Sequence, residues 1–482
     1  MSLREKYQVV IGLEVHAQLL TKTKAYSNDE NIYGAKPNTK TSIISLGHPG
    51  TLPKSNTKVI EYAVKLGVAV GASIREKNEY ARKNYFYADL PKGYQITQDT
   101  TPICNGGSIQ IKNKKGEAKQ IKITRIHMEE DAGKSIHDLD PFYTLIDLNR
   151  AGVPLIEIVS EPEISSSEEA YQYITEIRKL VRYLEICDGN MEEGSLRCDA
   201  NISVMLKNST VFGTKVEVKN MNSSRNVKRA IEFEIERQID LLEAGEDVIH
   251  ETRGFNASNN TTISMRHKED ANDYRYFPEP DLQPVIITEK YINNIKNLLP
   301  PLPNALFTTF TKKFGLSEYD ANILIEEKDI ALYFIEICNY TKNYKLAANF
   351  MNGSIKSYLN EKAVSITDFS ISPQRIASLI NIVDSGKVSN TIATSKIFPE
   401  MITCKELAEE IAQKNNWIQE SNSKALKDYI QQVMKNNPEK VIEYKKGKKG
   451  LIGLFMGEIM KLSKGQADPK LANQLLRTEL EK

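Results

Sequence analysis

Four segments of the sequence carry charged and imidazole side chains at every second position. An extended strand places alternate residues on opposite faces, so these side chains share one face of each segment. In chain order the four polar sets are Glu14 and His16; Arg125, His127, Glu129 and Asp131; Arg197, Asp199, Asn201 and Ser203; and Lys215, Glu217 and Lys219. Carboxylates with one or two imidazoles suit Mg²⁺ or Mn²⁺, and Arg or Lys beside them suits the phosphates of a nucleotide. The pattern therefore predicts a site for a divalent cation and a nucleotide triphosphate.

A half-exposed antiparallel sheet would give the same alternation without any site, because its polar face is simply solvated. The composition of the four faces favours a site, since they concentrate His, Glu, Asp, Asn and Arg instead of the Thr, Lys and Ser of solvated strands. The common phosphate-binding motifs are missing from the sequence. Gly133-Lys134-Ser135 resembles the end of a Walker loop, but Met128 stands where the first glycine is required. If ATP binds, the fold is not one of the common nucleotide-binding folds.

The elements that must position these residues change character near residue 300. From residue 7 to about 290, period-2 segments mix with amphipathic helices, which indicates an α+β region with a mainly antiparallel sheet. A capping box at Ser166–Glu169 is expected to start one helix, and a second helix is predicted from Asn226 to about Ala244. The proline cluster at 300–303 predicts a linker, because it cannot continue either element. Beyond it, apolar residues recur at helical spacing, which predicts an all-helical region.

Length and composition predict a folded, modular and cytosolic protein. The 482 residues are enough for roughly three domains, and 40% hydrophobic with 26% charged residues exclude a disordered chain. No apolar run approaches the roughly 18 residues that cross a bilayer, and residues 1–6 do not resemble a signal peptide, so no membrane association is expected. The five cysteines are scattered and lack Cys-x-x-Cys spacing. They are expected to be reduced packing residues, not disulfide partners or zinc ligands.

The charge is balanced overall but unevenly distributed. A net charge of +1 argues against a chain that binds a polyanion over its whole surface. Between Lys440 and Lys482, however, ten Lys or Arg residues face only five Asp or Glu residues. This segment belongs to a small helical unit, which is expected to follow a break near Phe398-Pro399 and to be interrupted at 436–438. A polyanion partner is therefore expected to bind locally, at the basic C-terminal segment.

Two further segments, residues 82–96 and 273–281, combine cations, aromatic residues and turn residues. Such a mixture is typical of a pocket for a nucleotide or a tRNA end. A tyrosine-rich edge strand has the same composition, so these two segments alone do not distinguish the alternatives.

Taken together, the segments resemble the family of B subunits of the bacterial glutamyl/aspartyl-tRNA amidotransferase. The matching segments are residues 11–16, 82–87, 89–96, 127–134, 147–159, 192–203, 273–281 and 464–467. They stand in family order and cover nearly the whole chain. The resemblance implies a cradle-shaped catalytic domain over residues 1–298, a helical domain over 299–405, and a small YqeY-like helical tail domain over 406–482 that contacts tRNA. These boundaries coincide with the linker and the break expected from the residues themselves.

The resemblance also implies an activity, that of a glutamine-hydrolysing carbon–nitrogen ligase. The family uses ATP and Mg²⁺ to phosphorylate the side-chain carboxylate of Glu on tRNA(Gln) or of Asp on tRNA(Asn), and ammonia then displaces the phosphate. A carboxylate is a poor electrophile, so the acyl phosphate supplies the leaving group. This sequence has no amidase-like nucleophile arrangement that could release ammonia from glutamine. That work is implied for a partner, the family's amidase (A) subunit, with the small (C) subunit making up a heterotrimer.

The resemblance further implies which residues bind the metal. Glu14, His16 and Glu129 are the first expected ligands, followed by Glu193 and Asp199. Glu193 either binds the metal or is solvated at a loop or helix end. Glu130 is left out, because the period-2 pattern points its side chain away from the polar face.

Three cations are expected to meet the nucleotide. Lys83 and Arg197 are implied to contact phosphate, whereas Lys134 either contacts phosphate or is merely exposed. Lys83 and Arg197 therefore join Glu14, His16 and Glu129 as the expected catalytic residues.

Two departures from the family pattern bear on these expectations. Some relatives carry zinc-binding cysteines after the first strand, but residues 26–29 read Tyr-Ser-Asn-Asp here, so no zinc is expected. In the tail, Glu458 stands where relatives often have Gln, which puts an acid inside the basic segment.

Two alternatives to the heterotrimeric ligase remain. A protein that only docks tRNA through its tail would have no need of His16, Glu129 and Asp199 on sheet faces. The archaeal relative specific for tRNA(Gln) carries an extra inserted domain, for which this chain has no room. The sequence does not distinguish Glu-tRNA(Gln) from Asp-tRNA(Asn) as the substrate.

Overall fold

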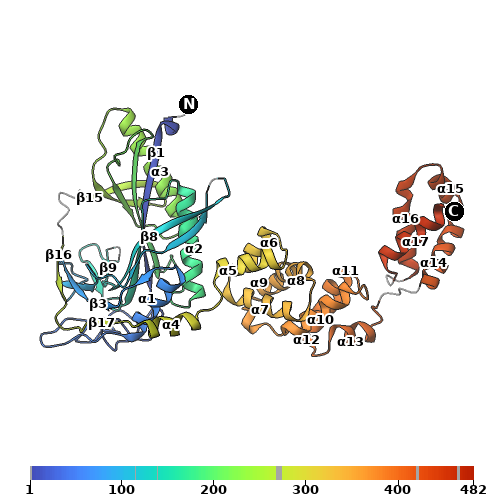
Figure 1. The fold of residues 1–482 in the computed structure, drawn as a ribbon, viewed down its shortest axis with the longest axis horizontal. Coiled ribbons are helices and arrows are strands. Elements are labelled where there is room, and N and C mark those ends of the chain that lie inside the picture. The colour runs from blue at the N-terminus through green and yellow to red at the C-terminus, as the bar shows by residue number, and fades with distance from the viewer. Residues whose placement is uncertain are drawn as a thin grey trace. The chain divides into compact units, whose positions relative to one another are not determined.

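The computed structural model describes residues 3–113, 115–137, 139–267, 274–418, 423–463 and 467–481. Asp273 and residues 464–466, which belong to the segments named above, lie outside these ranges. The chain divides into two compact units, Met1–Leu302 and Pro303–Lys482 (Figure 1). The division falls inside the expected proline linker. The strands lie in the first unit and the described part of the second unit is helical, which confirms the α+β class.

The first unit is built on a ten-stranded sheet in the order β15-β14-β13-β12-β1-β11-β8-β6-β2, with β7 also paired to β8. All its pairings are antiparallel except that of β13 with β14. The strands are β1 (Tyr7–Gln18), β2 (Ser73–Ile74), β6 (Cys104–Asn105), β7 (Ser108–Lys112), β8 (Ala118–Glu130), β11 (Pro154–Ser160), β12 (Leu196–Leu206), β13 (Val216–Lys219), β14 (Glu251–Asn256) and β15 (Thr261–His267).

Smaller sheets and helices complete this unit. The order β16-β4-β5 forms a three-stranded sheet, while β9 pairs with β10 and β3 with β17. These strands are β3 (Lys77–Asn78), β4 (Ala81–Asn84), β5 (Tyr94–Thr97), β9 (Lys134–Ile136), β10 (Leu145–Asp147), β16 (Arg275–Pro278) and β17 (Val285–Ile286). The helices are η1 (Leu3–Lys6), α1 (Thr57–Ala69), α2 (Ser167–Tyr183), α3 (Ser224–Glu243) and α4 (Glu289–Leu298).

Two helices cover the apolar face of the large sheet. The buried residues Ile11 and Leu13 of β1 share one hydrophobic core with Tyr173 of α2 and Ile231 of α3. Burying such side chains stabilises the fold by roughly 1.5–3 kcal/mol each. Because strand residues alternate, covering this face leaves Glu14, His16 and their counterparts on the opposite face. The sheet therefore presents one polar face with little room for register slips.

Both expected helices of this unit form, with small corrections. Ser166 caps α2 by accepting a hydrogen bond from the Glu169 backbone N–H at 3.3 Å. The capping box is wrong in its second half, because the Glu169 carboxylate accepts from Ser165 N–H at 2.9 Å instead of returning to Ser166. Helix α3 begins two residues earlier than predicted, since Ser223 provides the N-terminal cap.

The five cysteines are unpaired, and Cys104, Cys187 and Cys198 are buried, as expected for packing residues. Burial raises the pKa of the Cys104 thiol to about 12, which keeps it protonated and unreactive.

The second unit contains α5 (Pro303–Thr308), η2 (Thr309–Lys313), α6 (Glu318–Leu324), α7 (Lys328–Tyr340), α8 (Tyr344–Phe350), η3 (Met351–Ile355), α9 (Lys356–Lys362), η4 (Ile366–Asp368), α10 (Pro373–Asp384), α11 (Asn390–Ile392), η5 (Ala393–Ile397), α12 (Phe398–Thr403), α13 (Ala408–Lys414), α14 (Ser423–Asn436), α15 (Pro438–Lys445), η6 (Lys449–Leu451), α16 (Ile452–Leu462) and α17 (Pro469–Glu481). Among the described helices of the chain, none is long and apolar enough to cross a membrane.

The C-terminal helices α14 to α17 enclose a hydrophobic core that includes Leu426, Ile430, Phe455 and Leu476. The expected interruption at 436–438 is confirmed, since α14 ends and α15 begins there. The expected break at Phe398-Pro399 is wrong, because Pro399 lies in the first turn of α12. The chain stays helical through Pro399, because the π-helix η5 (Ala393–Ile397) runs directly into α12.

Candidate active site

The register of the large sheet places four functional side chains in one row across neighbouring strands. His16 of β1 lies opposite Arg197 of β12 on one side and Glu157 of β11 on the other, and Glu157 in turn lies opposite His127 of β8. Directly opposed residues have Cβ atoms roughly 5 Å apart, so these side chains meet although up to 181 positions separate them in sequence. Two residues before His16 on β1, Glu14 lies opposite Asp199.

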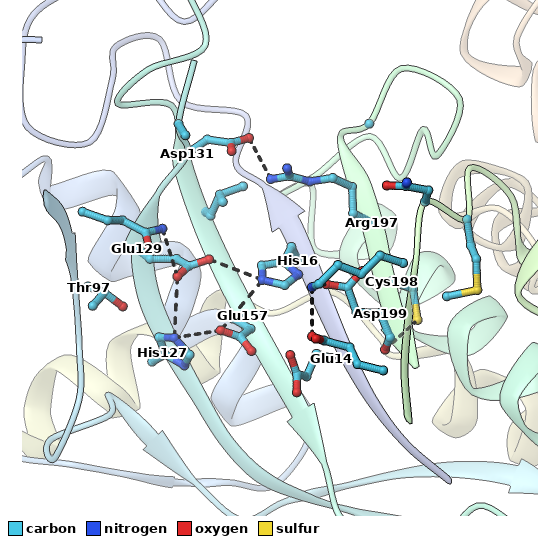
Figure 2. A pocket seen from close by; sticks show the side chains of 18 of the residues that line it. Glu14, His16, Thr97, His127, Glu129, Asp131, Glu157, Arg197, Cys198 and Asp199 are labelled. Carbon is cyan, nitrogen blue, oxygen red and sulfur yellow. Dashed lines mark hydrogen bonds and ion pairs between the residues drawn. The ribbon is translucent and has the colours of Figure 1, made fainter. Parts of the chain in front are cut away.

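This polar face forms the floor of a cavity of about 1230 Å³ (Figure 2). All four predicted polar sets contribute to its lining, through Glu14, His16, Arg125, His127, Glu129, Asp131, Arg197, Asp199, Lys215, Glu217 and Lys219. The alternation therefore marks a shared site, not four solvated strand faces. Asn201 lies outside the lining but donates from Nδ2 to Glu14 Oε1 at 2.9 Å.

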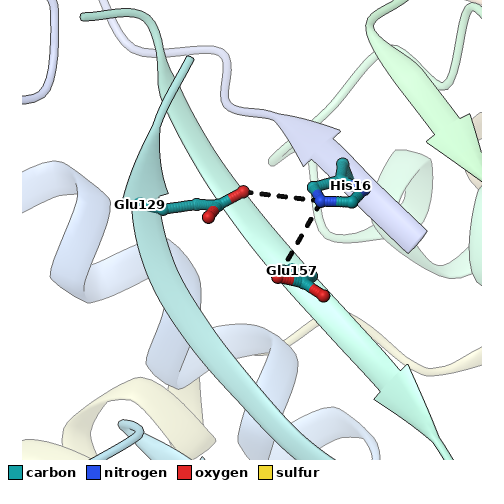
Figure 3. A group of neighbouring side chains, drawn as sticks. All are labelled: His16, Glu129 and Glu157. Atoms are coloured by element: carbon teal, nitrogen blue, oxygen red, sulfur yellow. Dashed lines mark ion pairs between the residues drawn. The ribbon is translucent and has the colours of Figure 1, made fainter. Parts of the chain in front are cut away.

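The first cluster of possible metal ligands consists of His16, Glu129 and Glu157 (Figure 3). His16 Nε2 lies 3.6 Å from Glu129 Oε1 and 3.8 Å from Glu157 Oε2. One ligand atom from each residue falls within 4.8 Å of the other two. Each residue comes from a different strand, β1, β8 and β11, so the sheet itself holds the spacing.

A second imidazole, that of His127, supports the two carboxylates of the first cluster. His127 Nε2 lies 3.0 Å from Glu157 Oε2 and 3.8 Å from Glu129 Oε2. Burial lowers the pKa of His127, but Glu157 and Glu129 outweigh it and raise the pKa to about 9. In the same way, burial raises the pKa of Glu157, but His127 and His16 outweigh it and hold that pKa well below its usual range. Glu157 is thus an ionised carboxylate paired with a protonated His127.

The second cluster consists of Glu14, Asp199 and Glu217, whose ligand atoms also lie within 4.8 Å of one another. Thr252 Oγ1 donates to Glu217 Oε2 at 2.9 Å. Lys219 Nζ lies 2.9 Å from Glu217 Oε1 and also pairs with Asp199. Burial and the nearby Glu157 raise the pKa of Glu14, against the hydrogen bond from Asn201. Three carboxylates therefore converge beside one ammonium group.

The donor atoms of both clusters fit a hard divalent cation. They comprise carboxylate oxygens and one imidazole nitrogen, the ligands that suit Mg²⁺ and Mn²⁺.

Two cationic side chains border the clusters. Lys83 of β4 lies with Nζ 4.6 Å from the centre of the Tyr274 ring and 5.8 Å from that of Tyr85. Burial lowers the pKa of Lys83, but Tyr276 and Glu129 outweigh it, so its pKa is raised and the ammonium stays charged.

Arg197, which also lines the cavity, is held by a buried carboxylate. Its Nη2 donates to Asp131 Oδ2 at 2.7 Å, and Gln18 Nε2 donates to the same oxygen at 2.9 Å. Anchored in this way, the guanidinium borders the cavity lining in a fixed position.

The structure brings most of the predicted site residues together. Glu14, His16, Glu129 and Asp199 fall into the two clusters, and Lys83 and Arg197 line the same cavity.

Two predicted residues lie apart from the clusters. Glu193 lines the cavity as an exposed residue and is outside both clusters found among the described residues. Lys134 is exposed on β9 and is not part of the lining. Glu130, which the period-2 pattern excludes, is buried away from this cavity, where it pairs with Lys92 and accepts from Ile96 N–H at 2.9 Å.

Sequence reasoning missed Glu157 and did not choose Glu217 or His127 as participants. Glu157 is a single acid within the otherwise apolar run 154–159, and an acid in a buried strand is itself an indication of a partnered charge. Glu217 and His127 lie on strand faces that were predicted to be polar. The sequence reasoning therefore found their faces but did not select these two residues as members of the site.

These features define a class: an α+β protein whose mainly antiparallel sheet carries an acid-rich cavity on its polar face. Residues 9–293 match the family described as the GatB/GatE catalytic domain, and residues 332–480 match the GatB domain. Three similar proteins are each named as the B subunit of aspartyl/glutamyl-tRNA(Asn/Gln) amidotransferase. That of Bdellovibrio bacteriovorus is 48% identical over 98% of this chain and 99% of its own. Those of Thermodesulfovibrio yellowstonii and Rickettsia typhi are 46% and 45% identical, over 98% and 99% of this chain and 98% of their own lengths.

The chain therefore belongs to the GatB family, the B subunits of the aspartyl/glutamyl-tRNA amidotransferases. The resemblance drawn from the sequence segments is confirmed.

Proposed function

We propose that this cavity uses ATP to phosphorylate the side-chain carboxylate of Glu on tRNA(Gln) or of Asp on tRNA(Asn), and that ammonia then converts the acyl phosphate into the amide. The observation that carries the proposal is the meeting of two carboxylate clusters with Lys83 and Arg197 in one cavity. The names of the relatives supply the substrate class, since they refer to both tRNAs.

The chemistry needs two displacements. In the first, a carboxylate oxygen attacks the γ-phosphorus of ATP and ADP leaves. In the second, ammonia attacks the acyl carbon, loses a proton, and phosphate leaves with the oxygen that came from the carboxylate. Both steps concentrate negative charge, which fixed cations stabilise most effectively when they are already oriented.

The residues of the cavity divide this work. Lys83 and the anchored Arg197, which both line the cavity, would contact phosphate oxygens. His16, Glu129 and Glu157 would hold one Mg²⁺, and Glu14, Asp199 and Glu217 a second. Bound Mg²⁺ would neutralise charge on the phosphates and so favour transfer. The exposed position of Glu193 does not support its predicted role as a metal ligand. The position of Lys134 outside the cavity lining does not support its predicted contact with phosphate.

The rest of the assembly follows from the same proposal. Ammonia would come from the amidase (A) subunit, which would form a cytoplasmic heterotrimer with this chain and the small (C) subunit. The tail, residues 406–482, would dock tRNA, since helices α14 to α17 have a core of their own and the segment after Lys440 is basic. A protein that only docked tRNA would have no use for buried Glu129 and His127 beneath a cavity.

The test is amidation by the purified heterotrimer. With ATP, Mg²⁺ and glutamine, it should convert Glu-tRNA(Gln) or Asp-tRNA(Asn) into the amidated form, and ammonium chloride should replace glutamine. Omitting ATP should stop the reaction with either nitrogen source. If neither tRNA yields product under these conditions, the proposal is wrong.

The tail is tested separately by truncation. Removing residues 419–482 keeps α13 intact and should weaken tRNA binding by the heterotrimer far more than ATP binding. The difference should grow as salt falls, because phosphate contacts strengthen at low ionic strength. Equal tRNA affinity with and without the tail would contradict its assignment.

A further inference from the structure

The two clusters differ in the charge that already neutralises them. In the first cluster, His16 is itself a possible ligand, and His127 contacts Oε2 of Glu129 while Oε1 faces His16. In the second cluster, the neutralising group is Lys219, which cannot serve as a ligand while protonated. Its ammonium pairs with two of the three carboxylates, Asp199 and Glu217.

The position of Lys219 follows from the fold. Lys219 and Glu217 are two residues apart on β13, so both side chains face the cavity. The neighbouring strand β12 presents Asp199 beside them. The Lys219 side chain is only 33% exposed, and its ammonium is held by ion pairs with Asp199 and Glu217. The ammonium is therefore tethered at the second cluster.

A divalent ion in the second cluster would bind two carboxylates that Lys219 already pairs with, those of Asp199 and Glu217. A divalent ion such as Mg²⁺ binds a carboxylate oxygen directly, at roughly 2.0–2.1 Å. An ammonium group that stays close to the same carboxylate would be strongly repelled by that ion, because both carry positive charge. The ion and the ammonium therefore compete.

We propose that Lys219 is the resident cation of the second cluster, so that a divalent ion binds there only when the ammonium moves away. The proposal rests on the proposed function, in which both clusters bind a divalent ion. The trigger is a polyphosphate in the cavity, whose oxygens offer the displaced ammonium a new partner and the incoming ion additional ligands. The first cluster binds its ion without nucleotide, and the second cluster binds its ion with nucleotide.

The chain offers a matched control in Lys215. It lines the same cavity and lies just before β13, but it is exposed. Lys215→Met and Lys219→Met remove the same charge from the same cavity, yet only Lys219 is paired with the second cluster.

The test counts Mn²⁺ ions bound to the full-length chain by electron paramagnetic resonance, without nucleotide. The wild type and Lys215→Met should bind one ion tightly, while Lys219→Met should bind two. The second ion should bind about tenfold more tightly, or better, in Lys219→Met than in the wild type. In the wild type the ion must first displace the hydrogen bond between Lys219 and a carboxylate, and a hydrogen bond between charged groups corresponds to about that factor. Lys219→Arg keeps the charge and should behave as the wild type. A non-hydrolysable ATP analogue should bring the second ion to the wild type.

Two results would overturn the proposal: a single ion in Lys219→Met, or two equally tight ions in the wild type without nucleotide. Failure of the proposed function looks different, because then Glu129→Gln would not remove the tight ion. Lys219→Met leaves three carboxylates without their cation, so its unfolding temperature should rise more on adding Mn²⁺ than that of the wild type. The same rise in unfolding temperature is measured for Lys219→Gln, which tests the proposal even if Lys219→Met folds poorly without metal. If Mn²⁺ raises the unfolding temperature of both variants and of the wild type equally, the proposal is wrong.

Discussion

The two carboxylate clusters share one sheet face but are stabilised by different neighbours. The first joins β1, β8 and β11 and is supported by the imidazole of His127 and the amide of Gln95, which donates to Glu129 Oε2 at 3.2 Å. The second joins β1, β12 and β13 and is supported by Asn201, Thr252 and Lys219. Strand register brings three ligands together in both cases. The difference lies in the neighbouring groups, which decide how firmly each cluster accepts an ion.

The largest effect is expected for Glu129→Gln in the first cluster. Glu129 contacts His16, His127 and Gln95. Replacing one carboxylate oxygen by an amide NH₂ group therefore removes a metal ligand and also weakens these contacts. ATP-dependent amidation by the heterotrimer should fall at least about 100-fold, more than the loss typical of a residue that only supports a ligand. Glutamine hydrolysis by the amidase partner should persist, and full amidation by the variant would contradict the metal assignment.

Glu130→Gln is the control on the same strand. Its carboxylate pairs with Lys92 on the other side of β8, so the change should lower the unfolding temperature without raising the Mg²⁺ concentration required for amidation.

A smaller effect is expected for Glu14→Gln in the second cluster. The amide still accepts from Asn201 but contributes less charge to the ion, so amidation should fall roughly 10- to 100-fold. High Mg²⁺ should restore part of the rate, because Asp199 and Glu217 remain. The comparison between the clusters fails if Glu14→Gln and Glu129→Gln respond identically to Mg²⁺.

The smallest effect is expected for Thr252→Val. The hydroxyl of Thr252 orients Glu217, so its loss should raise the Mg²⁺ concentration for half-maximal amidation about tenfold, and Thr252→Ser should restore it. Thr262→Val is the matched control, because that buried hydroxyl donates to Glu234 at 3.1 Å, outside the clusters. Thr262→Val should lower the stability of the protein without changing the Mg²⁺ concentration for half-maximal amidation. An unchanged Mg²⁺ requirement in Thr252→Val would show that Glu217 needs no orientation.

The sequence predicts the faces of individual strands well, because side-chain direction depends only on counting by two. Counting by two places Glu14, His16, Glu129 and Asp199 on polar faces, and the family resemblance then selects them as ligands. Partners across strands depend on register between distant segments, which no local pattern contains. Glu157 joins His16 only because β11 pairs with β1, and Thr252 reaches Glu217 only through the parallel pairing of β13 with β14.

The helical region shows the same limit. Helical spacing predicts the helices, but it does not show whether a proline ends one. Pro438 begins a new helix after an interruption, whereas Pro399 lies in the first turn of a helix that directly follows η5. The outcome depends on whether the preceding turn can continue into the proline, which tertiary packing decides.

The central claim is that the cavity makes an acyl phosphate, and the fate of one oxygen atom tests it most directly. Misacylated tRNA carrying ¹⁸O at both oxygens of the Glu or Asp side-chain carboxylate is amidated by the heterotrimer with ATP, and the phosphate released is analysed by mass spectrometry. If the carboxylate attacks the γ-phosphorus, each amide formed is matched by one phosphate that contains ¹⁸O. If amide forms while the released phosphate contains no ¹⁸O, water has hydrolysed the ATP, and the assignment of this cavity is wrong.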